Sequence, residues 1–162
     1  MIIDKYKVIF IHIPKNAGTS VETLFLNKSF RIQPHRHDNI SQIKRKFPEL
    51  YESHRKFTII RNPYDRMVSW YFYLKRNANI NNDYLNSIFK NKQHYSMVDF
   101  NEWIKDPISK FWHSDDPVNY LDPQYTWIDN TVEIIKFENL NKELNEFFGK
   151  EIDLPITNKT NH

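Results

Sequence analysis

The sequence predicts an α/β fold in which a mostly parallel sheet carries helices on its faces. Three apolar, β-branched runs support this prediction, at residues 8–13, 57–60 and 132–137, and apolar residues at helical spacing follow each run. Strands that alternate with helices pair in parallel, because each crossover helix returns the chain to the same end of the sheet. The chain has 162 residues, enough for one such domain and too few for two. We therefore expect residues 1–162 to form a single domain.

The first strand–helix unit surrounds one of the chain's two glycines, Gly18. Residues 8–13 (VIFIHI) are almost continuously apolar, as expected of a strand covered on both faces. Pro14 ends this strand and residues 15–20 form a turn, after which a helix is predicted from the spacing of Val21, Leu24 and Phe25. The segment therefore predicts a strand, a loop of anion-binding size and a helix.

The second unit begins with the strand at residues 57–60. Asn62 is placed to cap the following helix, Pro63 suits its first position, and Asp65 puts an acidic side chain in its first turn. The predicted buried face of this helix consists of Tyr64, Met67, Val68, Tyr71 and Leu74.

The third unit pairs the strand at residues 132–137 with an amphipathic helix that ends at Gly149. The apolar positions of that helix are Leu140, Leu144, Phe147 and Phe148. Shorter helices are predicted at residues 85–89 and 100–104, and another from the spacing of Ile40, Ile43 and Phe47.

Composition excludes several classes of protein. Lys and Arg number 23 against 20 Asp and Glu, for a net charge of +3, which is too balanced to indicate nucleic-acid binding. The absence of cysteine excludes disulfides and thiolate metal sites. The N-terminus has no signal-peptide pattern, and the longest apolar run is far shorter than the roughly 20 residues of a membrane span. We expect a cytoplasmic protein without a membrane span, and the sequence does not predict its oligomeric state.

The loop after the first strand has the chemistry of an anion site. A helix N-terminus directs backbone N–H groups and the positive end of its dipole toward whatever lies over it. Gly18 lets the backbone approach closely, Thr19 and Ser20 offer hydroxyls, and Lys15 adds a positive charge. In a standard nucleotide P-loop the Lys directly follows a Gly, whereas Lys15 precedes Gly18 by three residues. The loop therefore predicts a phosphate or sulfate site of another kind.

Residues 14–20 (PKNAGTS) resemble the 5′-phosphosulfate-binding loop of the sulfotransferase superfamily. The similarity is greatest to the carbohydrate branch, which includes the heparan and chondroitin sulfotransferases. It implies a P-loop-like three-layer fold and a donor, 3′-phosphoadenosine 5′-phosphosulfate, that leaves as 3′-phosphoadenosine 5′-phosphate. It also implies that the donor is bound by Lys15, Asn16, Ala17, Gly18, Thr19 and Ser20.

A second motif, residues 60–69 (IRNPYDRMVS), resembles the 3′-phosphate-binding segment of the same superfamily. The resemblance implies that Arg61, at the end of a strand, and Ser69, eight residues later in the helix, bind that phosphate. A guanidinium fork and a hydroxyl suit a phosphate monoester. Arg66 could serve the same site or pair with Asp65, and the sequence leaves both open.

Weaker resemblance extends to later landmarks, at Gln124 and at residues 137–140 (FENL). Residues 154–159 (LPITNK) are similar to a segment that helps close over the donor in the superfamily, where a further helix usually follows. We therefore expect the chain to be either a minimal form or truncated at its C-terminus relative to the family.

Sulfuryl transfer to an alcohol requires an in-line acceptor, a base for its proton and neutralisation of charge on the bridging oxygen. Lys15 is the candidate for the bridging oxygen. A base near neutral pH is most simply a histidine, and the resemblance implies one at the start of the helix between the two phosphate motifs, which favours His37 over His35. No metal is predicted, because no third ligand accompanies these histidines. His12, within the first strand, is expected to be buried and hydrogen-bonded.

The leading hypothesis is a sulfotransferase that acts on a hydroxyl of a carbohydrate or glycolipid. Two alternatives remain, a divergent P-loop phosphotransferase and a non-catalytic nucleotide-binding module. The absence of a clear magnesium-binding acid after a strand counts against the phosphotransferase. The acceptor itself is not identified by the sequence, since acceptor pockets are built from loops without a recognisable pattern.

Overall fold

The computed structural model describes residues 1–25, 36–77, 99–105 and 122–155. These residues fall into two compact units. The first comprises the described parts of Met1–Arg61 and Pro123–Lys159, and the second comprises those of Asn62–Asp122. The single domain over residues 1–162 stays a prediction.

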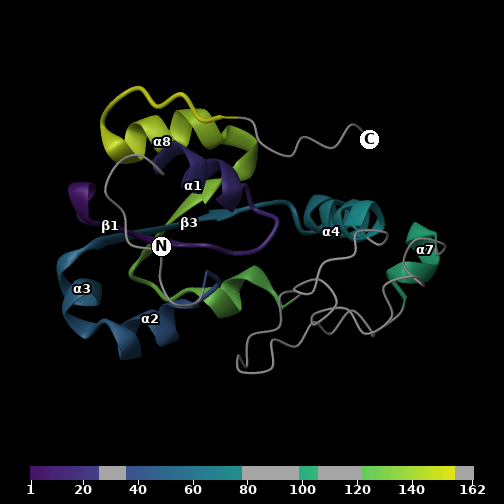
Figure 1. The fold of residues 1–162 in the computed structure, drawn as a ribbon, viewed down its shortest axis with the longest axis horizontal. Coiled ribbons are helices and arrows are strands. Elements are labelled where there is room, and N and C mark those ends of the chain that lie inside the picture. Colours follow the sequence, from purple (N-terminus) through teal and green to yellow (C-terminus); the bar gives the residue numbers. More distant parts are fainter. Residues whose placement is uncertain (26–35, 78–98, 106–121, 156–162) are drawn as a thin grey trace. The chain divides into compact units, whose positions relative to one another are not determined.

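The first unit contains a sheet of four strands in the order β1-β2-β3-β4 (Figure 1). The strands are β1 (Ile2–Ile3), β2 (Val8–Ile11), β3 (Arg55–Ile60) and β4 (Val132–Lys136). The last three run parallel, with Phe10 opposite Phe57 and Phe57 opposite Glu133, while the short β1 runs antiparallel to β2. The prediction of an α/β fold with a mostly parallel sheet is confirmed.

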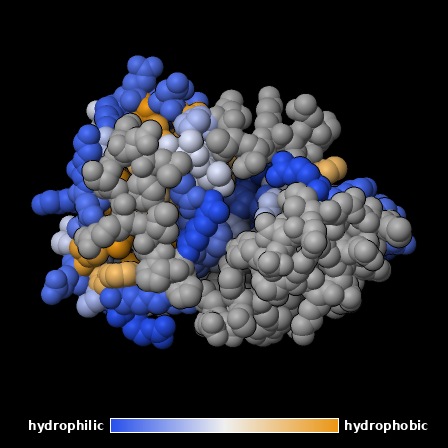
Figure 2. Space-filling view, viewed as in Figure 1, coloured by the Kyte–Doolittle hydropathy of each residue, from blue (hydrophilic) through white to orange (hydrophobic). Residues whose placement is uncertain are grey.

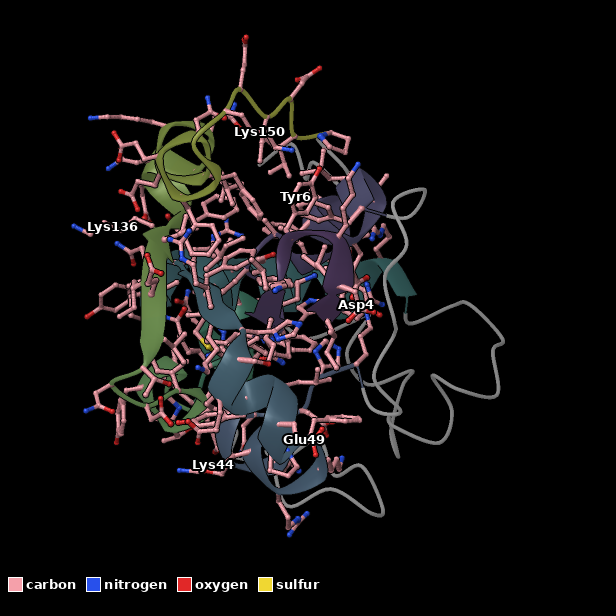
Figure 3. All side chains as sticks on the ribbon, turned by 90° about the vertical axis from the view of Figure 1, so that its left-hand side faces the viewer. Asp4, Tyr6, Lys44, Glu49, Lys136 and Lys150 are labelled. Atoms are coloured by element: carbon pink, nitrogen blue, oxygen red, sulfur yellow. The ribbon has the colours of Figure 1, made fainter. Side chains whose placement is uncertain are left out.

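Helices cover both faces of this sheet. Figure 1 shows α1 (Gly18–Phe25) and α8 (Leu140–Phe148) on one face, with α2 (Ile40–Lys46) and α3 (Pro48–Ser53) on the other. The side view in Figure 3 agrees, with Lys150 beyond α8 at one end and Lys44 and Glu49, from α2 and α3, at the other. Short 3₁₀ turns complete the unit at η1 (Asp4–Tyr6), η3 (Gln124–Trp127) and η4 (Phe137–Asn139). The predicted three layers are therefore present.

Alternation along β2 and β3 explains why both faces need cover. Val8 and Phe10 join the core cluster beneath α1 and α8, while Ile9 and Ile11 are equally buried and point to the other face. Aromatic rings dominate the first face, where the ring centroids of Phe10 and Phe57 are 4.9 Å apart. With apolar side chains inside, the described surface visible in Figure 2 is mainly hydrophilic.

The strand boundaries differ slightly from the predicted ones. β2 ends at Ile11 instead of residue 13, because the chain turns at His12 and the N–H of Ile13 bonds to the carbonyl of Ile11 at 3.2 Å. β3 begins two residues earlier than predicted, at Arg55, and β4 ends at Lys136. Neither β1 nor α3 was predicted, since two residues and six residues are too short to show a period.

The second unit begins with α4 (Pro63–Asn77), and Asn62 caps the start of this helix as predicted. The side chain of Asn62 accepts a hydrogen bond from the N–H of Tyr64 at 2.9 Å. The short helix α7 (Phe100–Trp103) is also present, and the ring of Tyr71 lies 5.4 Å from that of Phe100. The helix predicted at residues 85–89 lies outside the described residues.

The predicted buried face of α4 is partly wrong. Tyr64 is 78% exposed, whereas Arg66 is only 3% exposed and lies one turn before the buried Trp70. Arg66 can be buried because its guanidinium donates to the carbonyl of Asp122 at 3.0 Å. Burial lowers its pKa to about 10, so it remains charged at neutral pH. The buried face of α4 therefore includes a hydrogen-bonded arginine, where the hydropathy pattern predicted only the apolar and aromatic residues around it.

The end of α8 gives a test of backbone conformation alone. Gly149 has φ 63° and follows the last helical residue, and a Cβ added to it would meet no atom within 4 Å. We predict that Gly149→Ala lowers the free energy of unfolding by about 1 kcal/mol, the cost of a left-handed conformation. Gly149→Asn should cost less, because Asn tolerates this region. Urea denaturation measures both, and an equal loss in the two variants would contradict this account.

Candidate functional site

The loop between β2 and α1 is bent by residues other than glycine. Lys15 and Ala17 have φ 70° and 61°, in the left-handed region, while Gly18 does not. Non-glycine residues rarely adopt this conformation, and the residues that do are concentrated at ligand sites. The carbonyl of Ala17 then accepts from the N–H of Ser20 at 2.9 Å, which starts α1. This backbone conformation is typical of ligand sites, and the binding of an anion by the loop stays a prediction.

Gly18 has a structural role that the sequence did not reveal. A Cβ on this residue would lie 1.9 Å from Nε2 of His12, which is closer than any real contact. The imidazole of His12 thus fills the space that a side chain at position 18 would need. The predicted contact of Gly18 with an anion stays a prediction, but the packing of His12 is sufficient to require a glycine here.

Two side-chain amides, one buried and one half-buried, tie the loop to the end of β3. Asn16 is 1% exposed, and its Nδ2 donates to the carbonyl of Ile59 at 2.7 Å and to Oε1 of Gln124 at 2.6 Å. The amide of Gln124 also bonds the backbone of Arg61 twice, accepting from its N–H at 2.9 Å and donating to its carbonyl at 2.8 Å. We call these bonds the amide brace. It fixes the ends of two parallel strands, where ligands of such sheets bind.

Arg61 and Lys15 are brought together at this edge. The guanidinium of Arg61 lies over the ring of Phe137 at 4.4 Å and its Nη1 is 3.4 Å from the carbonyl of Lys15. Gln124 and Phe137, the two weaker landmarks in the sequence, therefore both contact Arg61. Ser69 lies on α4 in the other unit, so its predicted place beside Arg61 stays a prediction.

A pair of histidines lies behind the loop. Nδ1 of His37 donates to the backbone carbonyl of His12 at 3.0 Å, and the two rings are 4.4 Å apart. A carbonyl can only accept, so the neutral His37 ring carries its lone pair on Nε2. Burial, with the charge of His12 as the next cause, holds the pKa of His37 well below its usual value. His37 is therefore an unprotonated base at neutral pH, while His35 lies outside the described residues.

Local structure fixes the segment that carries His37. Two residues later, Asn39 caps α2, accepting from the N–H of Gln42 at 2.9 Å, and Gln42 Oε1 accepts from the N–H of Asn39 at 2.8 Å. This reciprocal capping box sets where the helix begins. The predicted helix after His37 is confirmed, and the role of His37 as base stays a prediction.

Glu22 and Arg36 form a network that sequence reasoning missed. Glu22 Oε1 accepts from Nδ1 of His12 at 2.9 Å and from Nε of Arg36 at 2.8 Å, and Oε2 accepts from Nη2 of Arg36. Nη2 also donates to the hydroxyl of Thr19 at 3.1 Å. Burial raises the pKa of Glu22, but the bonds from His12 and Arg36 outweigh it and lower the pKa to about 2. The sequence offered one indication of this network, because Thr19 and Glu22 are three residues apart in a predicted helix and therefore lie on the same face.

His12 itself is buried and paired, as predicted. It is 4% exposed, and burial lowers its pKa despite the hydrogen bond to Glu22. Among residues 1–25, 36–77, 99–105 and 122–155, no three His, Asp or Glu side chains form a group that could hold a metal ion. In the same ranges, no helix is both long enough and apolar enough to cross a bilayer.

The contact between Gly18 and His12 can be tested by a double-mutant cycle. We predict that Gly18→Ala costs about 1–3 kcal/mol of stability, because the added methyl group overpacks the imidazole. In a His12→Ala background the same change should cost markedly less, since the ring that it meets is gone. Urea denaturation of the four proteins measures the coupling, and additive losses would refute the contact.

Comparison with known proteins agrees with this arrangement. The profile described as the sulfotransferase family matches residues 1–150. No curated protein and no solved structure gives a significant match. The matched segment contains the whole sheet, the loop at residues 15–17 and the amide brace. The chain therefore belongs to the sulfotransferase family.

Proposed function

We propose that the protein transfers a sulfuryl group from 3′-phosphoadenosine 5′-phosphosulfate to a hydroxyl of a carbohydrate or glycolipid. Membership of the family supports sulfuryl transfer. The observation that carries the choice of donor is the amide brace, which joins the anion-type loop to Arg61. Two cationic positions at neighbouring strand ends suit a ligand with two separate anionic groups. The carbohydrate acceptor rests on the resemblance of residues 14–20 and 60–69, and a cytoplasmic location stays a prediction.

The residues present fit such a donor. The N-terminus of α1, the strained loop and the charge of Lys15 are suited to the phosphosulfate end. Arg61 offers a guanidinium that lies over Phe137, on a backbone that the brace holds, and a guanidinium suits the 3′-phosphate. When bound, the donor supplies a sulfuryl group attached to a phosphate leaving group. We assign to Lys15 the neutralisation of the charge that develops on the leaving oxygen.

His37 is proposed as the base. Its Nε2 carries the lone pair, because Nδ1 donates to the carbonyl of His12. Its lowered pKa keeps it unprotonated at neutral pH, so activity should be present above that pKa and be lost as the pH falls through it. The contact with His12 orients the ring, since one nitrogen is fixed by a backbone carbonyl.

Binding of the reaction product tests the donor. Adenosine 3′,5′-bisphosphate should raise the melting temperature, because it binds only the folded state, and adenosine 5′-monophosphate should do so far less. We predict that Arg61→Ala removes this preference, with a loss of about 10–100-fold in affinity for the bisphosphate. Arg45→Ala is the matched control, since Arg45 is an exposed arginine on α2. Stabilisation by ATP with magnesium but not by the bisphosphate would favour the phosphotransferase instead.

Turnover tests the base. We predict that His37→Gln lowers kcat by about 10²–10⁴-fold, the usual contribution of a general base, and leaves bisphosphate binding intact. His54→Gln serves as the control, because His54 caps α3 and lies outside the histidine pair. The assay follows bisphosphate release with unsulfated glycosaminoglycan oligosaccharides and a glycolipid as acceptors. Unchanged turnover in His37→Gln would contradict the assignment of His37 as the base and favour His35. If the unaltered protein binds the bisphosphate but shows no turnover, a non-catalytic module is favoured.

A further inference from the structure

Glu22 lies at the junction of three segments that meet behind the loop. It projects from α1 and accepts from His12, just past the end of β2, and from Arg36, immediately before His37. Its side chain is only 20% exposed, against 48% for Arg36. One carboxylate is thus shared between a buried imidazole and a guanidinium. Such sharing holds the neighbours of His37 in fixed positions.

We propose that Glu22 is a positioning residue for His37. Its carboxylate is the fixed negative charge that balances the imidazolium formed when His37 takes the acceptor's proton, and it fixes the position of His37 through His12 and Arg36. The inference rests on the proposed function. It assigns Glu22 a part in catalysis that involves no contact with substrate.

The alternative, that Glu22 is itself the base, is disfavoured by its contacts. Both oxygens already accept hydrogen bonds from cationic or ring N–H donors. Those bonds stabilise the ionised carboxylate, and with a pKa of about 2 it has little tendency to take a proton at neutral pH. The ring of His37 is instead neutral at neutral pH, and because its Nδ1 carries the proton, Nε2 is its basic nitrogen.

The charges that face His37 come from several segments and act in different directions. Glu22 raises its pKa, while His12 and Arg36 lower it. Asp38, the next residue, is paired with Nζ of Lys46 at 2.6 Å, so its charge is matched. The N-terminal amino group of Met1 also lowers the pKa of His12, but burial lowers the pKa of this amino group itself to about 5, so it is mostly uncharged at neutral pH. Among these groups Glu22 is the described anion that acts on both histidines.

The chemical step shows why the charge matters. The O–H bond of the acceptor breaks and its proton forms a bond to Nε2 of His37. The oxygen's electron pair forms the new bond to sulfur, and the old bond from sulfur to the phosphate oxygen breaks with its electrons on that oxygen. His37 therefore becomes cationic beside His12, whose ring is 4.4 Å away. A nearby carboxylate lowers the free energy of that state more than that of the neutral ground state.

Two variants with opposite expected effects test the electrostatic part. Histidine ring titration by NMR, on protein without donor, should show a lower pKa of His37 in Glu22→Gln and a higher one in Arg36→Gln. Glu133→Gln is the matched control, because it removes the same charge from an exposed pair with Arg55. Arg36 is exposed enough to be replaced without loss of the fold, so its variant keeps the test decisive if Glu22→Gln does not fold. Shifts in the same direction, or none, would overturn the proposal.

Kinetics test the catalytic part. Glu22→Gln should lower kcat by about tenfold or more, which is about 1.4 kcal/mol in the barrier, with the affinity for bisphosphate unchanged and the acid limb moved to lower pH. Glu133→Gln should keep the original kcat. If the pKa of His37 shifts in Glu22→Gln but kcat is unchanged, the positioning role is overturned. No turnover in the unaltered protein, with the titration shifts intact, would instead refute the proposed function and with it this role.

Discussion

The amides of Asn16 and Gln124 carry the connection on which the arrangement of the site depends. Their hydrogen bonds join the turn after β2 to Ile59 and Arg61, on either side of the last residue of β3, and the amide of Asn16 is buried. Each hydrogen bond adds only about 0.5–1.5 kcal/mol, but a buried amide left without its partner costs about 1–3 kcal/mol. These bonds therefore add little to the overall stability. Their larger effect is to raise the free energy of any arrangement in which Lys15 and Arg61 lie apart.

The histidine pair shows how polar side chains gather just past the end of a strand. β2 stops at Ile11, and the next residue turns its ring against the Cα of Gly18 and its carbonyl toward His37. The buried N–H of this imidazole needs a hydrogen-bond acceptor, and Glu22, one helical turn after Thr19, provides a carboxylate oxygen. Only one residue, Ile11, therefore separates Phe10 of the apolar core from His12 of the histidine pair.

Local patterns in the sequence predicted much of the fold, because they depend on neighbours along the chain. The runs of β2 and β4, the cap at Asn62 and the glycine after α8 all belong to this kind. The pairing of Asn16 with Gln124 could not be predicted, since 108 residues separate them. The burial of Arg66 depends equally on a distant carbonyl, that of Asp122. Lys15, Arg61 and His37 are predicted from motifs and their roles stay predictions, whereas the link between Glu22 and Arg36 is visible only in the folded chain.

The left-handed residues of the loop have a further consequence for how a ligand is bound. Lys15 and Ala17 hold positive φ at a cost that glycine would not have, so the contacts around the loop must keep this conformation in the folded protein. A ligand that enters such a loop meets a shape already formed and loses little conformational entropy in ordering it. Binding at this turn should therefore be limited by diffusion and desolvation, with no slow closing step of the loop itself.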